Sequence, residues 1–253
     1  MDPLAEEFPA WSPYNFTMNN PIRLIDPDGR APLDIIGATK SDANKFKDDV
    51  HNVLSDAKFT NLRGLIDVKG KKFNKIDAGD LSNALNGVTL TADEQAYVDV
   101  VVNTINSSEQ HVVEYLNSSD NASSNGATAV KEHLNSAVGK GIGDGMLTPE
   151  GNLKGGTISV LGGEGFNVPT KKGSHSFLIE DKISTANDRS VTSGHEVFGH
   201  GIPSARKMSN TANNTNAIRT DNLIRRIFGM PERNGSNHAG GVVTDYSKLP
   251  ITK

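Results

Sequence analysis

The stretch SGHEVFGHG, at residues 193–201, is the strongest indication in this sequence of a local helix and of the chemistry that the chain supports. It places two imidazoles and one carboxylate within six residues, and small residues flank them. Imidazole nitrogens are common zinc ligands, and a carboxylate beside the metal can take a proton from a bound water. We therefore expect a helix that begins here, a Zn²⁺ ion held by His195 and His200, and Glu196 as the general base of a metal-dependent hydrolase.

The spacing of the two histidines departs from regular helix geometry. His195 and His200 are five residues apart, and at about 100° per residue they would point roughly 140° away from each other on an α-helix. A π-helical turn, with about 4.4 residues per turn, reduces this angle to roughly 50°. Gly199 stands just before the second histidine and tolerates unusual backbone angles, so we expect the helix to widen there.

The pattern H-E-x-x-G-H at residues 195–200 resembles that of the dipeptidyl peptidase III family of zinc peptidases. The resemblance covers this motif alone. It implies that the two histidines are zinc ligands, that Glu196 is the catalytic base and that the catalytic region is zincin-like. The alternative is a capping box, in which Ser193 caps a helix and Glu196 returns the hydrogen bond, and the histidines bind no metal.

A third zinc ligand has to come from another part of the chain. Residues 216–228 carry apolar side chains at helical spacing, and Gly229 and Pro231 end the pattern. In zinc peptidases with two histidines on one helix, the third ligand is often a carboxylate on the following helix. Asp221 is the only acid of this segment, and we predict that it binds the zinc. The alternative is an i,i+4 ion pair between Asp221 and Arg225.

His238 is the second choice for the third ligand. It lies in a glycine-rich loop, residues 234–241. A histidine in such a loop can also donate a hydrogen bond to a developing oxyanion, so we treat His238 as a catalytic candidate as well. Tyr246 and His175 are weaker candidates, because such residues are more often structural than catalytic.

The beginning of the chain carries a different kind of pattern. DPLAEEFPAWSPYN at residues 2–15 and NNPIRLIDPDG at residues 19–29 resemble the end of the RHS (YD-repeat) core of polymorphic toxins. In that family a large β-shell encloses a variable C-terminal toxin and often cuts itself near the paired Asp-Pro motif. The first Asp-Pro here lacks the glycine of the fuller motif, and Arg30 replaces an apolar residue, so self-cleavage stays open. The resemblance implies that the residues after about 31 form a secreted toxin, delivered into target cells and neutralised in the producer by an immunity protein.

Composition limits the partners of the chain. The net charge is −4 and Lys and Arg form no cluster, so a nucleic acid is not expected as a partner. No run of about 18 apolar residues is present, and we expect no membrane span. Cysteine is absent, which excludes disulfides and leaves nitrogen and oxygen as the only ligands for zinc.

The remaining pattern predicts an α+β fold, mainly helical with a small antiparallel sheet. Residues 118–125, rich in Ser, Asn and Asp, are the best candidate for an internal boundary. We expect an RHS-core leader at 1–31, a helical lobe at 32–125 and a zinc metallopeptidase-like catalytic domain at 126–253. The expected helices are 41–56, 78–85, a helix ending at 105 that starts with the capping box of Thr91 and Glu94, 127–138 and 216–228, and the expected strands are 111–116, 157–161 and 175–180.

Three functions fit these observations. The first is a zinc peptidase toxin that hydrolyses peptide bonds in target-cell proteins after release from an RHS shell. The second is a zinc amidase that acts on cell-wall peptides, with the same site chemistry. The third is a non-enzymatic surface or shell-plug domain in which the histidines are incidental.

Overall fold

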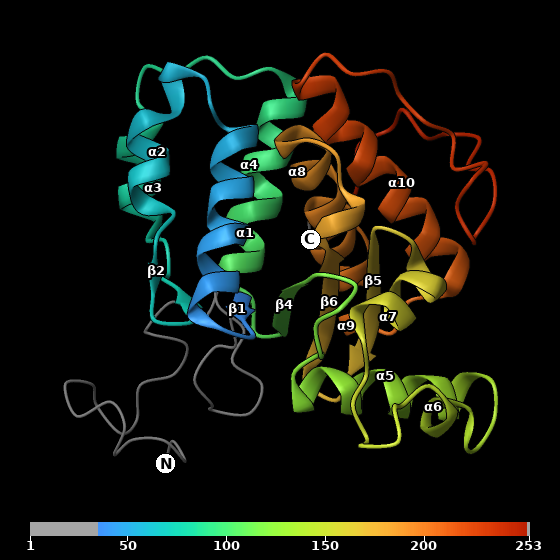
Figure 1. Cartoon of the computed structure of the whole chain (residues 1–253). Helices are drawn as coiled ribbons and strands as arrows, with labels where there is room; N and C mark the ends of the chain where they lie inside the picture. Colours follow the sequence, from blue (N-terminus) through green and yellow to red (C-terminus); the bar gives the residue numbers. More distant parts are fainter. Residues whose placement is uncertain (1–34, 252–253) are drawn as a thin grey trace, which may run out of the picture.

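The computed structural model describes residues 35–251. The N-terminal pattern that resembles an RHS core lies outside these described residues. One six-stranded sheet forms the centre of the described chain, with strand order β2-β3-β1-β4-β6-β5 (Figure 1). Its strands are β1 (Ile35–Gly37), β2 (Val68–Lys69), β3 (Lys72–Phe73), β4 (Gln110–Leu116), β5 (Gly165–Thr170) and β6 (Gly173–Ile179).

The sheet is mixed, and the expectation of an antiparallel sheet is wrong. β4 runs parallel to both of its neighbours, β1 and β6. β1–β3, β2–β3 and β5–β6 are the antiparallel pairs. Long crossovers that contain helices separate β1 from β4 and β4 from β6, and such crossovers bring the chain back in the same direction. β5 is the outermost strand at one edge.

Helices account for most of the other described residues. The expected helices at 41–56, 78–85, 127–138 and 216–228 are present with shifted ends, and the capping box of Thr91 and Glu94 begins α4 as predicted. The helical elements are α1 (Lys40–Val53), η2 (Ala57–Phe59), α2 (Thr60–Leu65), α3 (Ala78–Ala84), α4 (Ala92–Ile105), α5 (Ser124–Ala137), α6 (Ile142–Gly145), α7 (Gly155–Gly162), η3 (Glu180–Lys182), α8 (Ala186–Gly194), η4 (His195–His200), α9 (Gly201–Ala205) and α10 (Asn210–Ile227).

Helices cover both faces of the sheet. Every residue of β6 is buried, which is typical of a strand with helices on both sides. Leu178 packs into the larger core with α1, α4, α8 and α10, whereas Phe177 and Ile179 point the other way, into a smaller core with α5 and α7. In Figure 1, α1, α4, α8 and α10 accordingly lie above the strands, and α5 and α6 lie below them.

The middle of the chain contains one predicted strand and the predicted domain boundary. The predicted strand at 157–161 is wrong, because these residues form α7, with Ile158 buried and Val160 exposed. A short apolar run suits a helix or a strand equally well. The expected boundary after residue 125 falls in the first turn of α5. β4 and β6, on either side of it, pair along their whole length, so the ranges 32–125 and 126–253 share one sheet.

Candidate metal centre

The two motif histidines lie on a π-helical turn. η4 spans His195–His200 and continues α8 without a break, and the N–H of Gly201 donates to the carbonyl of Glu196 five residues earlier. The ring centroids of the two histidines are 4.8 Å apart. The π-turn predicted from their spacing is therefore confirmed, and both imidazoles are on one side of the helix.

The expectation that a helix begins at the motif is wrong. It begins at Ala186, nine residues before His195, where the side chain of Thr185 caps it. Ser193 is an interior residue whose hydroxyl donates to the carbonyl of Ser190 at 3.2 Å. Ser193 and Glu196 therefore form no capping box, and this alternative interpretation of the motif is wrong.

Gly199 matters to the π-turn because it has no side chain, and its backbone conformation is an ordinary one. It is not among the glycines with positive φ. A Cβ on Gly199 would lie 2.8 Å from the Cα of Ala217 on α10, a distance that real Cβ atoms do not show. Gly199 thus permits the π-turn to pack directly against the backbone of α10, the helix that precedes the loop of the third histidine.

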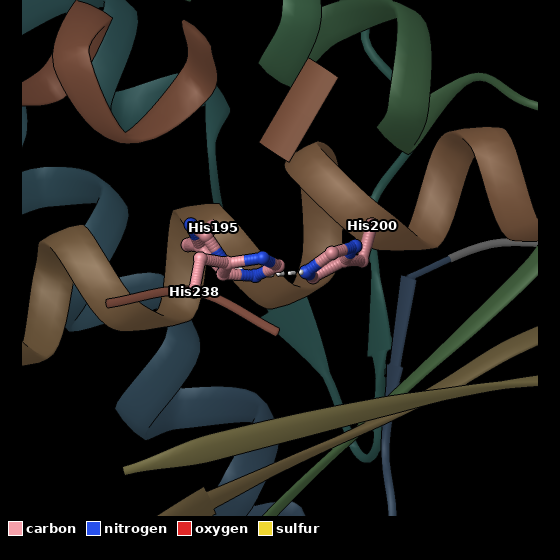
Figure 2. A group of neighbouring side chains, drawn as sticks. All are labelled: His195, His200 and His238. Atoms are coloured by element: carbon pink, nitrogen blue, oxygen red, sulfur yellow. Dashed lines mark hydrogen bonds between the residues drawn. The ribbon is translucent and has the colours of Figure 1, made fainter. Parts of the chain in front are cut away.

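His238 completes a group of three imidazoles. Its Nε2 lies 3.2 Å from Nε2 of His195 and 3.1 Å from Nε2 of His200, and Figure 2 shows the three rings converging. Nitrogens that bind Zn²⁺ tetrahedrally at about 2.0–2.1 Å are roughly 3.3 Å apart. The three side chains, with ligand atoms all within 4.8 Å of one another, can hold a metal ion.

Asparagines on α10 fix the loop that carries His238. The side chain of Asn222 is fully buried. It donates to the carbonyls of Arg233 at 2.7 Å and Tyr246 at 3.2 Å, and accepts from the N–H of Arg233 at 2.7 Å. Asn216 accepts from the N–H of Ile251 at 2.6 Å. These hydrogen bonds hold the segment after α10 on both sides of His238.

Burial keeps the three imidazoles neutral. It lowers the pKa of His200 to about 4, although the hydrogen bond with Asn213 acts in the opposite direction. The pKa of His195 is held well below its usual value by burial and then by the two neighbouring histidines. Burial also lowers the pKa of His238. Neutral imidazoles offer lone pairs at neutral pH, as metal ligands must.

Asp221 lies behind His195, away from the point where the three Nε2 atoms meet. Its carboxylate is fully buried and its Oδ2 is 3.8 Å from Nδ1 of His195. The same carboxylate binds Arg225 at 2.6 Å and contacts Arg233. The i,i+4 ion pair, which was the alternative for Asp221, is therefore present, and the structure groups His238 rather than Asp221 with the two motif histidines.

Glu196 is a buried carboxyl without a full set of partners. Its Oε2 has no hydrogen bond, as is also true of Nδ1 of His195. A Cβ on Gly165 of β5 would lie 2.8 Å from its Oε1. Burial raises the pKa of Glu196 to about 8, and the charge of Asp221 acts in the same direction. A nearby cation would favour the charged form of this carboxyl.

A cavity of about 570 Å³ opens onto the carboxyl of Glu196 and onto two of the three histidines. Its walls include His195, Glu196, His238, Tyr246 and the beginning of β5 at Gly165. Tyr246, one of the weaker catalytic candidates, therefore lies at the cavity.

His175 does not reach this cavity. It is buried in the sheet, where Nε2 is 2.8 Å from Oε2 of Glu114 and its ring stacks on Phe177. Its contacts are those of a structural residue.

One polar residue of the site escaped the sequence analysis. The side-chain oxygen of Asn213, in the first turns of α10, contacts Nδ1 of His200. The sequence signal was the run of asparagines at 210–222, where Asn214, Asn216 and Asn222 are buried on a helix that packs against the core. Buried asparagines need hydrogen-bond partners, and here the partners belong to the site and its loop.

Comparison with protein-family models, curated proteins and solved structures finds no match to this chain. Across residues 35–251, no helix combines the length and the apolar character that crossing a bilayer requires.

Proposed function

We propose that this protein is a zinc-dependent hydrolase that cleaves peptide bonds, with His195, His200 and His238 as the metal ligands. The observation that carries the proposal is the convergence of three neutral imidazoles next to a buried carboxyl that has an unpartnered oxygen. Three protein ligands and an open position are typical of catalytic zinc sites. His238 replaces Asp221 as the third ligand, because only its Nε2 faces the other two.

Glu196 is the general base in this proposal. When bound, zinc acts as a Lewis acid and lowers the pKa of a coordinated water toward about 7. Glu196 lies next to His195 in sequence and lines the same cavity, where it can accept a proton from water and pass it to an amine leaving group. Gly165 leaves room for the carboxyl, since a Cβ at this position of β5 would lie 2.6 Å from Cγ of Glu196.

The edge of the sheet favours an extended peptide as the substrate. β5 is the outermost strand, and Gly162, Glu164 and Gly165, at and just before its beginning, line the cavity. An extended chain can bind such an edge through main-chain hydrogen bonds, and side-chain pockets then add selectivity. This arrangement would place a peptide bond close to Glu196.

Zinc content and hydrolysis test the proposal together. Wild type and Glu196→Gln are purified without chelator, and their zinc is measured by elemental analysis. Both are then incubated with a fluorescence-quenched peptide library and with isolated peptidoglycan. We expect one zinc per chain in both proteins and peptide cleavage by the wild type alone. Folded wild type without zinc would overturn the metal centre, and zinc-loaded wild type that cleaves neither substrate would overturn the hydrolase. Cleavage of peptidoglycan alone would support the amidase instead.

We further propose that the hydrolase is the toxin of an RHS polymorphic toxin, encapsulated by the shell of its parent chain. The support is the pattern at residues 2–29. The chain expressed inside bacterial cells should lower viability, and Glu196→Gln should not. If both proteins lowered viability equally, toxicity would not depend on hydrolysis. If neither protein lowered viability, the chain would not be a toxin.

A further inference from the structure

A chain of hydrogen bonds starts at the imidazole of His200. Its Nδ1 contacts the side-chain oxygen of Asn213 on α10. The side-chain nitrogen of Asn213 then donates to the hydroxyl of Ser204 on α9, at 3.0 Å. His200 thus reaches, through α10, the short helix that follows it in the sequence.

The same chain continues through the sheet and returns to the π-turn. Ser204 donates its hydroxyl hydrogen to the side-chain oxygen of Asn167 on β5, at 2.8 Å. Asn167 donates through its side-chain nitrogen to the hydroxyl of Ser176 on β6, at 2.8 Å, and Ser176 donates to the main-chain carbonyl of Glu196, at 3.1 Å. Five hydrogen bonds therefore link His200 to Glu196, the residue that follows His195.

The carbonyl at the end of this chain sets its direction. A carbonyl can only accept, so the hydroxyl of Ser176 must donate to Glu196 and receive its own hydrogen bond from the amide nitrogen of Asn167. The oxygen of Asn167 then accepts from Ser204, which in turn accepts from the nitrogen of Asn213. The oxygen of Asn213 is left facing His200 and can only accept. Nδ1 of His200 must therefore carry the hydrogen.

The anchor carbonyl also belongs to the π-turn. The N–H of Gly201 donates to the same Glu196 carbonyl, five residues earlier, at the C-terminal end of the π-turn. A carbonyl oxygen has two lone pairs, so it can accept from Gly201 and Ser176 together. The hydrogen-bond chain is thus tied to the backbone feature that brings the two motif histidines to one side.

We infer that Asn213 is a positioning residue, which holds His200 as the Nδ1–H tautomer and so directs the Nε2 lone pair to the centre shared with His195 and His238. The inference rests on the proposed metal centre. Partners of this kind fix the tautomer and ring orientation of ligating histidines, and their loss typically lowers metal affinity by roughly 10–100-fold. Asn213 acts through His200 and binds no metal itself.

The tautomer is measurable without any metal. Long-range ¹H–¹⁵N spectra of the chelator-treated protein at pH 8 should show His200 with the hydrogen on Nδ1. Asn213→Leu removes the acceptor, and the hydrogen should shift toward Nε2. In Asn213→Asp the carboxylate still accepts, and Nδ1–H should remain. Asn210→Leu is the control, since Asn210 lies exposed in the first turn of the same helix. Finding Nε2–H in the wild type would overturn the inference.

Zinc titration against a competing chelator gives the second readout. We expect Asn213→Leu to weaken zinc binding by roughly 10–100-fold, with Asn213→Asp and Asn210→Leu within a few-fold of wild type. Ser204→Ala keeps Asn213 but removes the next hydroxyl in the hydrogen-bond chain, so the loss of zinc affinity should be smaller. This variant keeps the test informative if Asn213→Leu does not fold. Wild type that binds no zinc would refute the metal centre, whereas wild type and both Asn213 variants binding equally would refute the role of Asn213.

Discussion

The Nε2 atoms of His200 and His238 lie 3.1 Å apart, although 38 residues and the whole of α10 separate them in the sequence. Local helix geometry fixes His200, whereas His238 depends on where the loop after α10 docks. The buried side chain of Asn222 holds that loop through three hydrogen bonds. The histidine group proposed to bind the metal is therefore assembled by tertiary structure as much as by the motif.

This assembly predicts that His238 matters as much to metal binding as the motif histidines do. Loss of a residue that hydrogen-bonds a metal ligand typically lowers metal affinity by up to roughly 100-fold. His238→Ala and His200→Ala should each lower zinc affinity by more than this, because each removes a ligand itself. Competition with a chromophoric chelator measures the affinity. His133→Ala is the matched control, because this half-buried histidine lies on α5 against Phe166. A loss confined to His200→Ala would exclude His238 as a ligand.

Asp221→Asn separates the two candidates for the third ligand. Asp221 faces Nδ1 of His195 from 3.8 Å and neutralises Arg225 and Arg233. We expect zinc affinity to fall by no more than roughly 10–100-fold. The free energy of unfolding of the metal-free protein should fall by roughly 3 kcal/mol, since Arg225, whose side chain is only 13 % exposed, loses its partner. Urea unfolding and chelator competition measure the two effects. Zinc loss as severe as in His238→Ala would instead make Asp221 a ligand.

Gly165→Ala tests the contact between β5 and the proposed base. The added Cβ would lie 2.6 Å from Cγ of Glu196, so the carboxyl must move. Hydrolysis should fall by up to about 100-fold, the effect of a shift of roughly 1 Å at a reacting group, while zinc binding is retained. Steady-state cleavage and zinc content are measured together.

Gly64→Ala is the control for this substitution. Gly64 lies within α2, where an added Cβ meets nothing within 4 Å. Alanine there should leave hydrolysis unchanged and stabilise the fold by up to about 1 kcal/mol. If Gly165→Ala were as active as Gly64→Ala, the backbone of β5 would have no part in positioning Glu196.

The elements that the sequence predicted best are those whose signals are local. The five-residue spacing of His195 and His200 required a π-turn, and η4 supplies it. The capping box of Thr91 and Glu94 predicted the start of α4, and both of its hydrogen bonds are present. In each case residues that are close together in the sequence carry the signal for the local backbone geometry.

The differences between the sequence pattern and the structure concern contacts between distant segments. Asp221 has the position in α10 expected of a ligand, but two arginines share its carboxylate, and one of them, Arg233, comes from the loop after the helix. The parallel pairing of β4 with β6 made the sheet mixed, and it joins two strands that α5, α6 and α7 separate in the sequence. The run that became α7 has β-branched residues, yet Ile158 is buried in a helix. Tertiary packing decided all three.

A buried histidine outside the metal centre should make the stability of the protein depend on pH. His111 on β4 is 1 % exposed, and its Nδ1 lies 3.0 Å from the hydroxyl of Ser174. Burial lowers its pKa from 6.5 to about 4, with Glu109 opposing and Arg206 adding to the shift. The folded protein therefore holds this imidazole neutral at a pH where the unfolded chain protonates it.

The sign of the effect follows from proton binding. Between pH 6.5 and about 4 the unfolded state binds the extra proton, so His111 stabilises the fold above pH 6.5 and this contribution is lost as the pH falls. At pH 5 the loss is about 2 kcal/mol. Urea unfolding at pH 8 and pH 5 should show that His111→Gln is less sensitive to acid than wild type by this amount. The metal-site histidines are the same in both proteins and cancel in the comparison. An unchanged pH dependence, in His111→Gln or in His111→Val, would mean that this buried imidazole does not control acid stability.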